Sequence, residues 1–199
     1  MLDYETRKKQ YITLMEEMLC AYHGRTCSRT RELYVKKKQE VVGSLARMIE
    51  GAKESLENYI LCQKKGKIQY IHFSYLLSGA LSGEMLVKLD FYDSRYYTDE
   101  EEIDCYWNCS GLFPDVETEY RALKEELDKK LIRLQSAEAS QLRVGMWVLN
   151  YRILKMILME MVREKQVERQ LKAFCEETAC LFYGAYLDEA EVIHRLKEE

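Results

Sequence analysis

The chain has 199 residues, of which 47% are hydrophobic and 32% charged, and its formal net charge is −4. This composition is typical of a globular protein and excludes low-complexity and largely disordered chains. A membrane span is excluded as well, because the most apolar stretch, residues 146–162, contains Arg152, Lys155 and Glu160.

Pro114 is the single proline, where average usage would give roughly ten. Because proline interrupts helices, a chain nearly free of it can be helical along most of its length. An aromatic and acidic stretch, residues 67–113, precedes Pro114. The sequence therefore predicts a single α+β domain, predominantly α-helical: residues 1–66 are helical, residues 67–113 form a β insert, and residues 114–199 are helical.

The first helix is expected to span about residues 4–22. One apolar stripe recurs along it at intervals of three and four residues: Tyr11, Met15, Met18 and Tyr22. Gly24 follows, and glycine is common just after the last turn of a helix. We therefore expect the helix to end there.

The second helix is expected to begin near Ser28 or Thr30, whose hydroxyl groups can cap free N–H groups, and to end before Gly66. Unbroken, it has about 34 residues and measures roughly 50 Å. A kink near Gly43 or Gly51 is the alternative, because glycine weakens a helix interior.

The side-chain period changes to two within the insert. Apolar residues alternate along two stretches, which are Ile71, Phe73, Tyr75, Leu77 and then Met85, Val87, Leu89, Phe91. A third strand is expected within residues 103–109. The prediction is a small antiparallel β-meander at about residues 68–109, with one face packed on helices. The alternative keeps residues 71–81 helical.

After the insert, apolar residues return to helical spacing. We expect helices at residues 116–134, 141–164 and 167–183, the last ended by Gly184, and a short helix at residues 187–197. The predicted architecture is a bundle of about five or six helices that carries the meander.

Charge is unevenly distributed along the chain. Residues 1–67 hold 14 Lys and Arg against 9 Asp and Glu, a net of +5, whereas residues 68–118 hold 2 against 10, a net of −8. Two such regions can face each other within one fold or across a dimer. The simpler interpretation is a set of solvated faces that differ in charge.

The seven cysteines are an odd number, and the first 20 residues are too charged for a signal peptide. We therefore expect reduced thiols in a cytoplasmic protein. Cys20, His23 and Cys27 have a spacing that can bring three zinc ligands to one helix face. Because Gly24 is expected to break that helix, we favour unliganded thiols and no cofactor, with zinc as the alternative.

An acidic run comprises Asp99, Glu100, Glu101, Glu102 and Asp104. It lacks the glycine and the spacing of a calcium loop, so we interpret it as a solvated loop that protects a sheet edge. A site for a metal or a basic partner is the alternative.

Aromatic residues crowd the same insert. The candidate ligand or interface residues are Tyr70, His72, Tyr92, Tyr96, Tyr97, Tyr106 and Trp107. Aromatic residues at this density either fill the core of a small sheet or form a pocket or an interface. A pocket is expected to lie between the sheet and the helices.

A basic cluster marks the start of the second predicted helix: Arg25, Arg29, Arg31, Lys36, Lys37 and Lys38. Phosphate contacts need such charges on one face, but Glu32 and Glu40 interrupt the cluster. A solvated helix face is therefore favoured over a nucleic-acid site.

The sequence contains no P-loop, no dinucleotide-binding glycine motif and no nucleophile elbow. We therefore favour a non-catalytic protein-interaction or regulatory module, homodimeric, that uses the aromatic and acidic insert or an apolar helix stripe for contact. The expected partner is a second copy or another protein, with no membrane contact. The alternatives are a small-molecule sensor or enzyme with an aromatic pocket, and nucleic-acid binding through residues 25–38.

Overall fold

A computed structural model gives the fold and describes residues 4–131 and 133–196. The helices of these residues are α1 Tyr4–Lys36, α2 Lys38–Leu61, α3 Gly79–Ser82, α4 Val116–Lys130, α5 Ser136–Met161 and α6 Lys165–Lys172, with 3-10 turns η1 Tyr96–Thr98 and η2 Ser110–Leu112. The strands are β1 Ile68–Tyr75, β2 Leu86–Tyr92, β3 Asp104–Asn108, β4 Cys175–Ala185 and β5 Ala190–Arg195. The predicted class, α+β and predominantly α-helical, is confirmed.

The strands form one sheet in the order β3-β2-β1-β4-β5. The predicted meander is confirmed, since β1, β2 and β3 pair antiparallel in chain order. The alternative helix over residues 71–81 is wrong, because β1 is extended up to Tyr75 and only the short α3 follows it. The sheet is larger than the meander, because β4 pairs parallel with β1 and antiparallel with β5.

The helix predicted at residues 167–183 is therefore wrong beyond α6, and the helix predicted at residues 187–197 is wrong because β5 occupies Ala190–Arg195. Residue 197 lies outside the described residues. Residues 179–183 are continuously apolar, and a short apolar run does not distinguish a buried strand from a helix. The run belongs to β4, which is hydrogen-bonded to β1 along one edge and to β5 along the other. Gly184, expected to stop a helix, instead permits a close approach, since a Cβ there would lie 2.3 Å from the Glu189 carbonyl oxygen.

The predicted end of the first helix at Gly24 is also wrong, because α1 continues to Lys36. The buried stripe that includes Tyr22 continues through Thr26 and Thr30, both 1% exposed. The two threonines extend the buried face of α1 with polar side chains. A search for apolar periodicity therefore does not detect this part of the helix. As a result, α2 begins at Lys38 rather than near Ser28.

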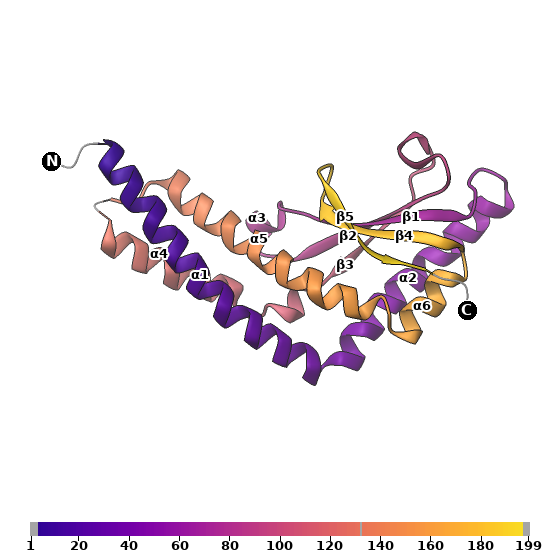
Figure 1. Cartoon of the computed structure of the whole chain (residues 1–199), viewed down its shortest axis with the longest axis horizontal. Coiled ribbons are helices and arrows are strands. Elements are labelled where there is room, and N and C mark those ends of the chain that lie inside the picture. Colours follow the sequence, from indigo (N-terminus) through magenta and orange to yellow (C-terminus); the bar gives the residue numbers. More distant parts are fainter. Residues whose placement is uncertain (1–3, 132, 197–199) are drawn as a thin grey trace.

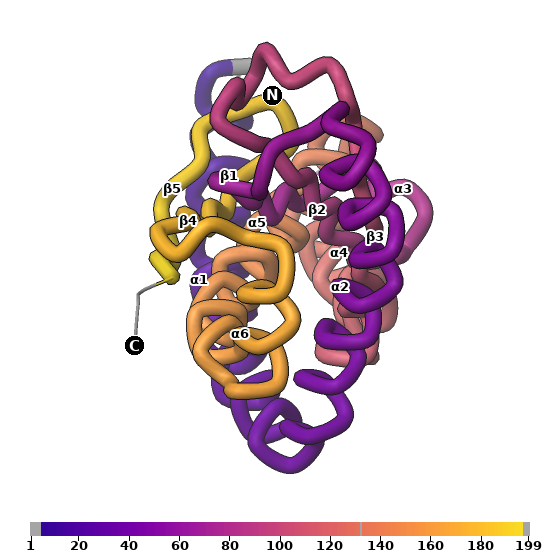
Figure 2. The backbone as a smooth tube through the Cα atoms, turned by 90° about the vertical axis from the view of Figure 1, so that its right-hand side faces the viewer, coloured from indigo at the N-terminus to yellow at the C-terminus, as the bar shows by residue number. Residues whose placement is uncertain are grey.

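The long helices lie on one side of the sheet, and the loop between β2 and β3 stands on the other (Figure 1). α1 and α5 run side by side in the same direction, since Arg7 pairs with Glu138 and Tyr22 donates to Asn150. α2 turns back from α1 to run beside α6 and β3, as the end view of the tube also shows (Figure 2). One cluster of buried apolar residues joins the helices to the inner face of the sheet.

Two glycine substitutions are expected to have opposite effects. Gly184→Ala should lower the free energy of unfolding by about 2 kcal/mol, because its Cβ would clash with the backbone of Glu189 and Ala190. Gly24→Ala should raise it by about 0.5–1 kcal/mol, since Gly24 lies inside α1 and a Cβ there meets nothing within 4 Å. Urea denaturation measures both, and a destabilising Gly24→Ala would contradict the continuous α1.

Candidate functional site

The candidate site is the outer face of the sheet, which points away from the long helices. Side chains alternate along β1, so Ile71 and Phe73 belong to the core while Tyr70 and His72 lie on the outer face. The register of β2 places Tyr92 directly opposite Tyr70. The strands therefore fix the positions of these outer side chains.

Six rings pack together on this face and form the aromatic cluster: Tyr70, His72, Tyr92, Tyr96, Tyr97 and Phe182. The His72 ring stacks on Phe182 with centroids 4.7 Å apart, and the Tyr70 and Tyr96 rings meet edge to face at 4.6 Å. Each such contact contributes about 0.5–1.5 kcal/mol beyond the burial of area. The cluster therefore fastens the loop between β2 and β3 to the sheet.

His72 is the polar centre of the cluster. Its side chain is buried, and its Nε2 atom lies 2.9 Å from the Tyr96 hydroxyl. Burial lowers the pKa of His72 from 6.5 to about 4. The imidazole is therefore neutral at pH 7 and serves as a hydrogen-bonding ring in an apolar layer.

The loop at residues 93–103 has a strained backbone at Tyr96, whose φ is 53°. A bulky residue rarely adopts this left-handed conformation, which costs about 1–3 kcal/mol. The Tyr96 side chain is half-buried within the cluster, whereas the next residue, Tyr97, is 66% exposed. Other contacts must therefore hold the loop in this shape.

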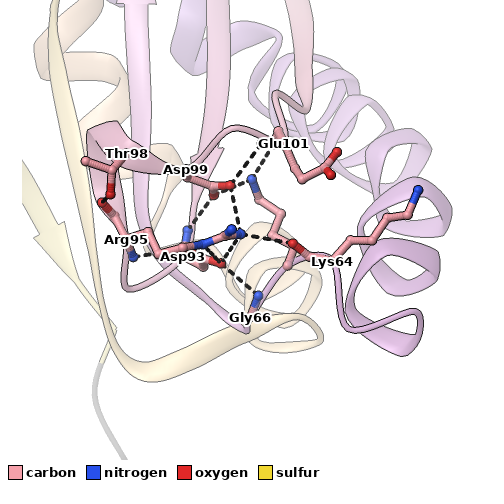
Figure 3. A network of polar contacts seen from close by, with 8 residues as sticks. Lys64, Gly66, Asp93, Arg95, Thr98, Asp99 and Glu101 are labelled. Atoms are coloured by element: carbon pink, nitrogen blue, oxygen red, sulfur yellow. Dashed lines mark hydrogen bonds and ion pairs between the residues drawn. The ribbon is translucent and has the colours of Figure 1, made fainter.

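Those contacts form the ion network, which consists of Lys65, Asp93, Arg95 and Asp99. Figure 3 labels the last three of these residues. The Lys65 ammonium group lies 2.5 Å from the Asp99 carboxylate, and the two side chains are 1% and 0% exposed. The Arg95 guanidinium group contacts Asp93 at 2.8 Å and Asp99 at 3.1 Å (Figure 3). The prediction of a solvated acidic loop is therefore wrong for Asp99, which is a buried anchor.

Backbone groups complete the ion network. The Asp93 carboxylate accepts from the Gly66 N–H at 2.9 Å, which ties the loop to the turn before β1 (Figure 3). Burial alone would raise the pKa of Asp93, but hydrogen bonds from Arg95 and from the N–H groups of Gly66 and Arg95 outweigh it and lower the pKa to about 2. Asp93 is therefore charged throughout the physiological range.

A second ion cluster surrounds Lys88 on the outer face of β2. Its ammonium group lies 2.7 Å from Asp90, 2.8 Å from Glu102 and 3.2 Å from Asp104, and 4.8 Å from the centre of the Tyr186 ring. Burial would lower the pKa of Lys88, but its hydrogen bonds to the carboxylates raise it. The three carboxylates have the spacing of metal ligands, yet the cation that they surround is the lysine itself.

Two of the seven aromatic candidates lie outside the cluster. Tyr106 is on the outer face of β3, opposite Lys88, and is 53% exposed. Trp107 is buried on the inner face, where its Nε1 atom donates to Ser44 of α2 at 3.0 Å. The candidates therefore do not line one pocket between the sheet and the helices. Phe182 was missed because its segment was assigned to a helix.

The zinc candidates Cys20, His23 and Cys27 all lie on α1, and Cys20 is exposed. Among the described residues, these three do not form a group with ligand atoms within 4.8 Å of one another. The geometry thus gives no reason to place a metal there.

The basic candidates are divided among different neighbours. Arg29 pairs with Glu119 of α4 at 2.9 Å, Arg31 pairs with Glu160 of α5, and Lys38 pairs with Glu164 at 2.5 Å. Arg25, Lys36 and Lys37 complete the candidate set. Half of the six basic side chains are thus engaged in ion pairs within the chain.

What remains accessible on the outer face is an acidic–aromatic surface. It consists of Tyr97, Glu100, Glu102, Asp104 and Tyr106. The Glu102 side chain is 70% exposed even though it contacts Lys88. Exposed aromatic rings next to carboxylates, on a backbone fixed from below, are suited to contact a basic protein surface.

None of the described helices combines the length and the hydropathy needed to cross a membrane. A scan against protein-family models finds no match for this chain, and searches of curated proteins and of solved structures find none either.

Proposed function

We propose that the protein is a non-catalytic interaction module whose acidic–aromatic surface binds a partner rich in lysine and arginine. The observation that carries the proposal is the exposure of Tyr97, on a loop that is fixed by the ion network. Tyrosine is a frequent hot spot in protein interfaces, and a loop ordered before binding loses little entropy on association.

Charge supports the choice of partner. Residues 68–118 carry a net charge of −8, and Glu100 and Glu102 are exposed beside Tyr97. Complementary charge steers association and penalises acidic partners. We expect the affinity to fall as ionic strength rises, because exposed charges are screened.

In this proposal the polar groups beneath the surface have a structural role, because they are paired or packed within the chain. The Lys88 ammonium group is held by three carboxylates, and His72 is neutral and packed between rings. We also propose a reducing, cytoplasmic location, which is supported by seven cysteines that are all free thiols.

Site-specific photocrosslinking tests the proposal. A photoreactive phenylalanine analogue placed at Tyr97 or Tyr106, in the cells that make the protein, should give adducts with the same partner. The analogue at Val144, which is 40% exposed on α5, is the matched control and should give no adduct with that partner. An adduct with the same partner in equal yield from Val144 would contradict the proposed surface.

Two variants complete the test. Tyr97→Ala and Glu102→Lys should each abolish the adduct formed from position 106 at a temperature well below the unfolding midpoint of each variant. Tyr97→Ala should also lower the thermal midpoint, because it loses ring contacts with His72, Tyr92 and Tyr96. Unchanged capture by both variants would refute the proposal. An adduct of twice the chain mass would identify the partner as a second copy.

A further inference from the structure

The junction of α1 and α2 lacks the residues that normally separate two helices. A single residue, Lys37, stands between them, and it makes no side-chain capping hydrogen bond to α2. Residues 33–41 contain no glycine, proline, serine, threonine, asparagine or aspartate. The sequence accordingly predicts one helix that passes through this position, whereas the structure turns there (Figure 1).

The turn gives up helical hydrogen bonds. The first N–H groups of any helix lack carbonyl partners from the preceding turn, and no cap at Lys37 replaces them. Helical bonds persist on either side, from Lys37 N–H to the Leu33 carbonyl at 2.9 Å and from Val41 N–H to the Lys37 carbonyl at 3.0 Å. Straightening this junction would therefore complete a helix already formed on both sides.

The contact of α1 with α5 combines apolar packing, such as that of Leu19 against Gly145, with specific polar pairs. Arg7 makes a bidentate contact with Glu138 at 2.6 and 2.8 Å, and Tyr22 donates to Asn150 at 2.8 Å. Further along, the hydroxyl groups of Thr30 and Tyr34 are buried and have no hydrogen-bond partner among the described residues. Such pairs fix the register, whereas unpartnered buried groups weaken the contact.

We propose that α1 is exchanged between two copies of this chain. The junction at Lys37 straightens, so that residues 4–61 form one helix of about 87 Å, and α1 then docks on the α5 of the second copy. The partner's α1 docks reciprocally, and every pair between α1 and α5 is made between chains. This inference does not depend on the proposed function, because it uses the opposite side of the molecule from the acidic–aromatic surface.

The occupant of the α5 face is a second copy, because the interface between α1 and α5, called the seam here, is complementary to this α1 alone. The Arg7–Glu138 pair is 18% and 11% exposed, and the Tyr22 to Asn150 hydrogen bond is fully buried. A foreign helix would leave these groups unpaired, which is costly in a buried seam. Exchange replaces each contact by an identical one and gains the helical bonds at Lys37.

A pair of charge-reversal variants distinguishes exchange from every other arrangement. Arg7→Glu alone and Glu138→Arg alone each place like charges at the seam, whether the chain is closed or paired with its own kind. When the two variants are refolded together, an exchanged heterodimer restores one opposite-charge pair on each side. Native mass spectrometry should then show heterodimers well above the half expected from random pairing.

A random proportion of heterodimers, or a parent chain that keeps a mass of 23.7 kDa in light scattering up to millimolar concentration, would overturn the proposal. Lys37→Ala and Lys37→Gly provide a second measurement that needs no change in the seam. Alanine favours the continuous helix and glycine disfavours it, so the dimer dissociation constant should be at least about tenfold larger for Lys37→Gly. Equal constants would also count against exchange.

Discussion

Asp99→Ala is expected to lower the free energy of unfolding by about 3–5 kcal/mol, which is the usual consequence of removing one partner of a buried ion pair. The variant leaves the Lys65 ammonium group, 1% exposed, without its carboxylate, and it also removes an acceptor from Arg95. Lys65 then retains the Glu101 carbonyl group as its hydrogen-bond acceptor. Urea denaturation measures the loss.

Two controls show whether burial causes the effect. Glu126→Ala removes an exposed ion pair with Lys130 and should leave the denaturation midpoint unchanged. The double variant Lys65→Met with Asp99→Leu should recover only part of the loss. It removes the unpaired Lys65 charge but still leaves Arg95 and the N–H groups of Asp93 and Glu101 without the Asp99 acceptor. A loss below about 1 kcal/mol for Asp99→Ala would contradict the role of the ion network.

Acidification from pH 6.5 to pH 4 should lower the free energy of unfolding by about 2–3 kcal/mol through His72 alone. Because burial lowers the pKa of His72 to about 4 in the folded chain, the unfolded chain binds a proton in this range that the folded chain does not. The contribution is fully present above pH 6.5 and is lost as pH falls toward 4. Chemical denaturation across this range measures it.

His72→Phe is the matched variant, since it keeps a ring against Phe182 and removes the titrating group. Its stability should depend less on pH between 6.5 and 4, and at pH 7 it should lose about 1 kcal/mol because the Tyr96 hydroxyl loses its partner. Asp93 contributes to stability in a lower pH range. Because its pKa in the folded chain is about 2, its contribution to the free energy of unfolding is lost only as pH falls below 4. The same pH slope in His72→Phe and the parent would contradict the buried neutral histidine.

Periodicity in the sequence predicts the elements whose two faces differ. β2 alternates between core and outer face, and α4 keeps a single apolar stripe, so both were located correctly. β4 has neighbours on both sides and carries the apolar run at residues 179–183, which hides its period. The β-branched pair Val192 and Ile193, after the polar residues Asp188 and Glu189, is the local signal that favours a separate strand at β5.

The candidate site was predictable in composition but not in geometry. The aromatic and acidic character of residues 67–113 marks the region, and the outer-face alternation of Tyr70 and His72 follows from the strand. The ion network joins Lys65 to Asp99, 34 residues apart, and no local pattern specifies such a pair. Phe182 reaches the cluster only because β4 lies beside β1, which is a long-range pairing.

The central claim is that the ion network holds the loop at residues 93–103 rigidly beneath Tyr97. Amide hydrogen exchange followed by NMR tests it at the N–H groups that donate to the network carboxylates, which are those of Gly66, Asp93, Arg95 and Glu101. We expect these four amides to exchange nearly as slowly as those inside β1 and β2. Exchange at the rate of an unstructured peptide would show that the loop is not fixed in advance and would contradict the account.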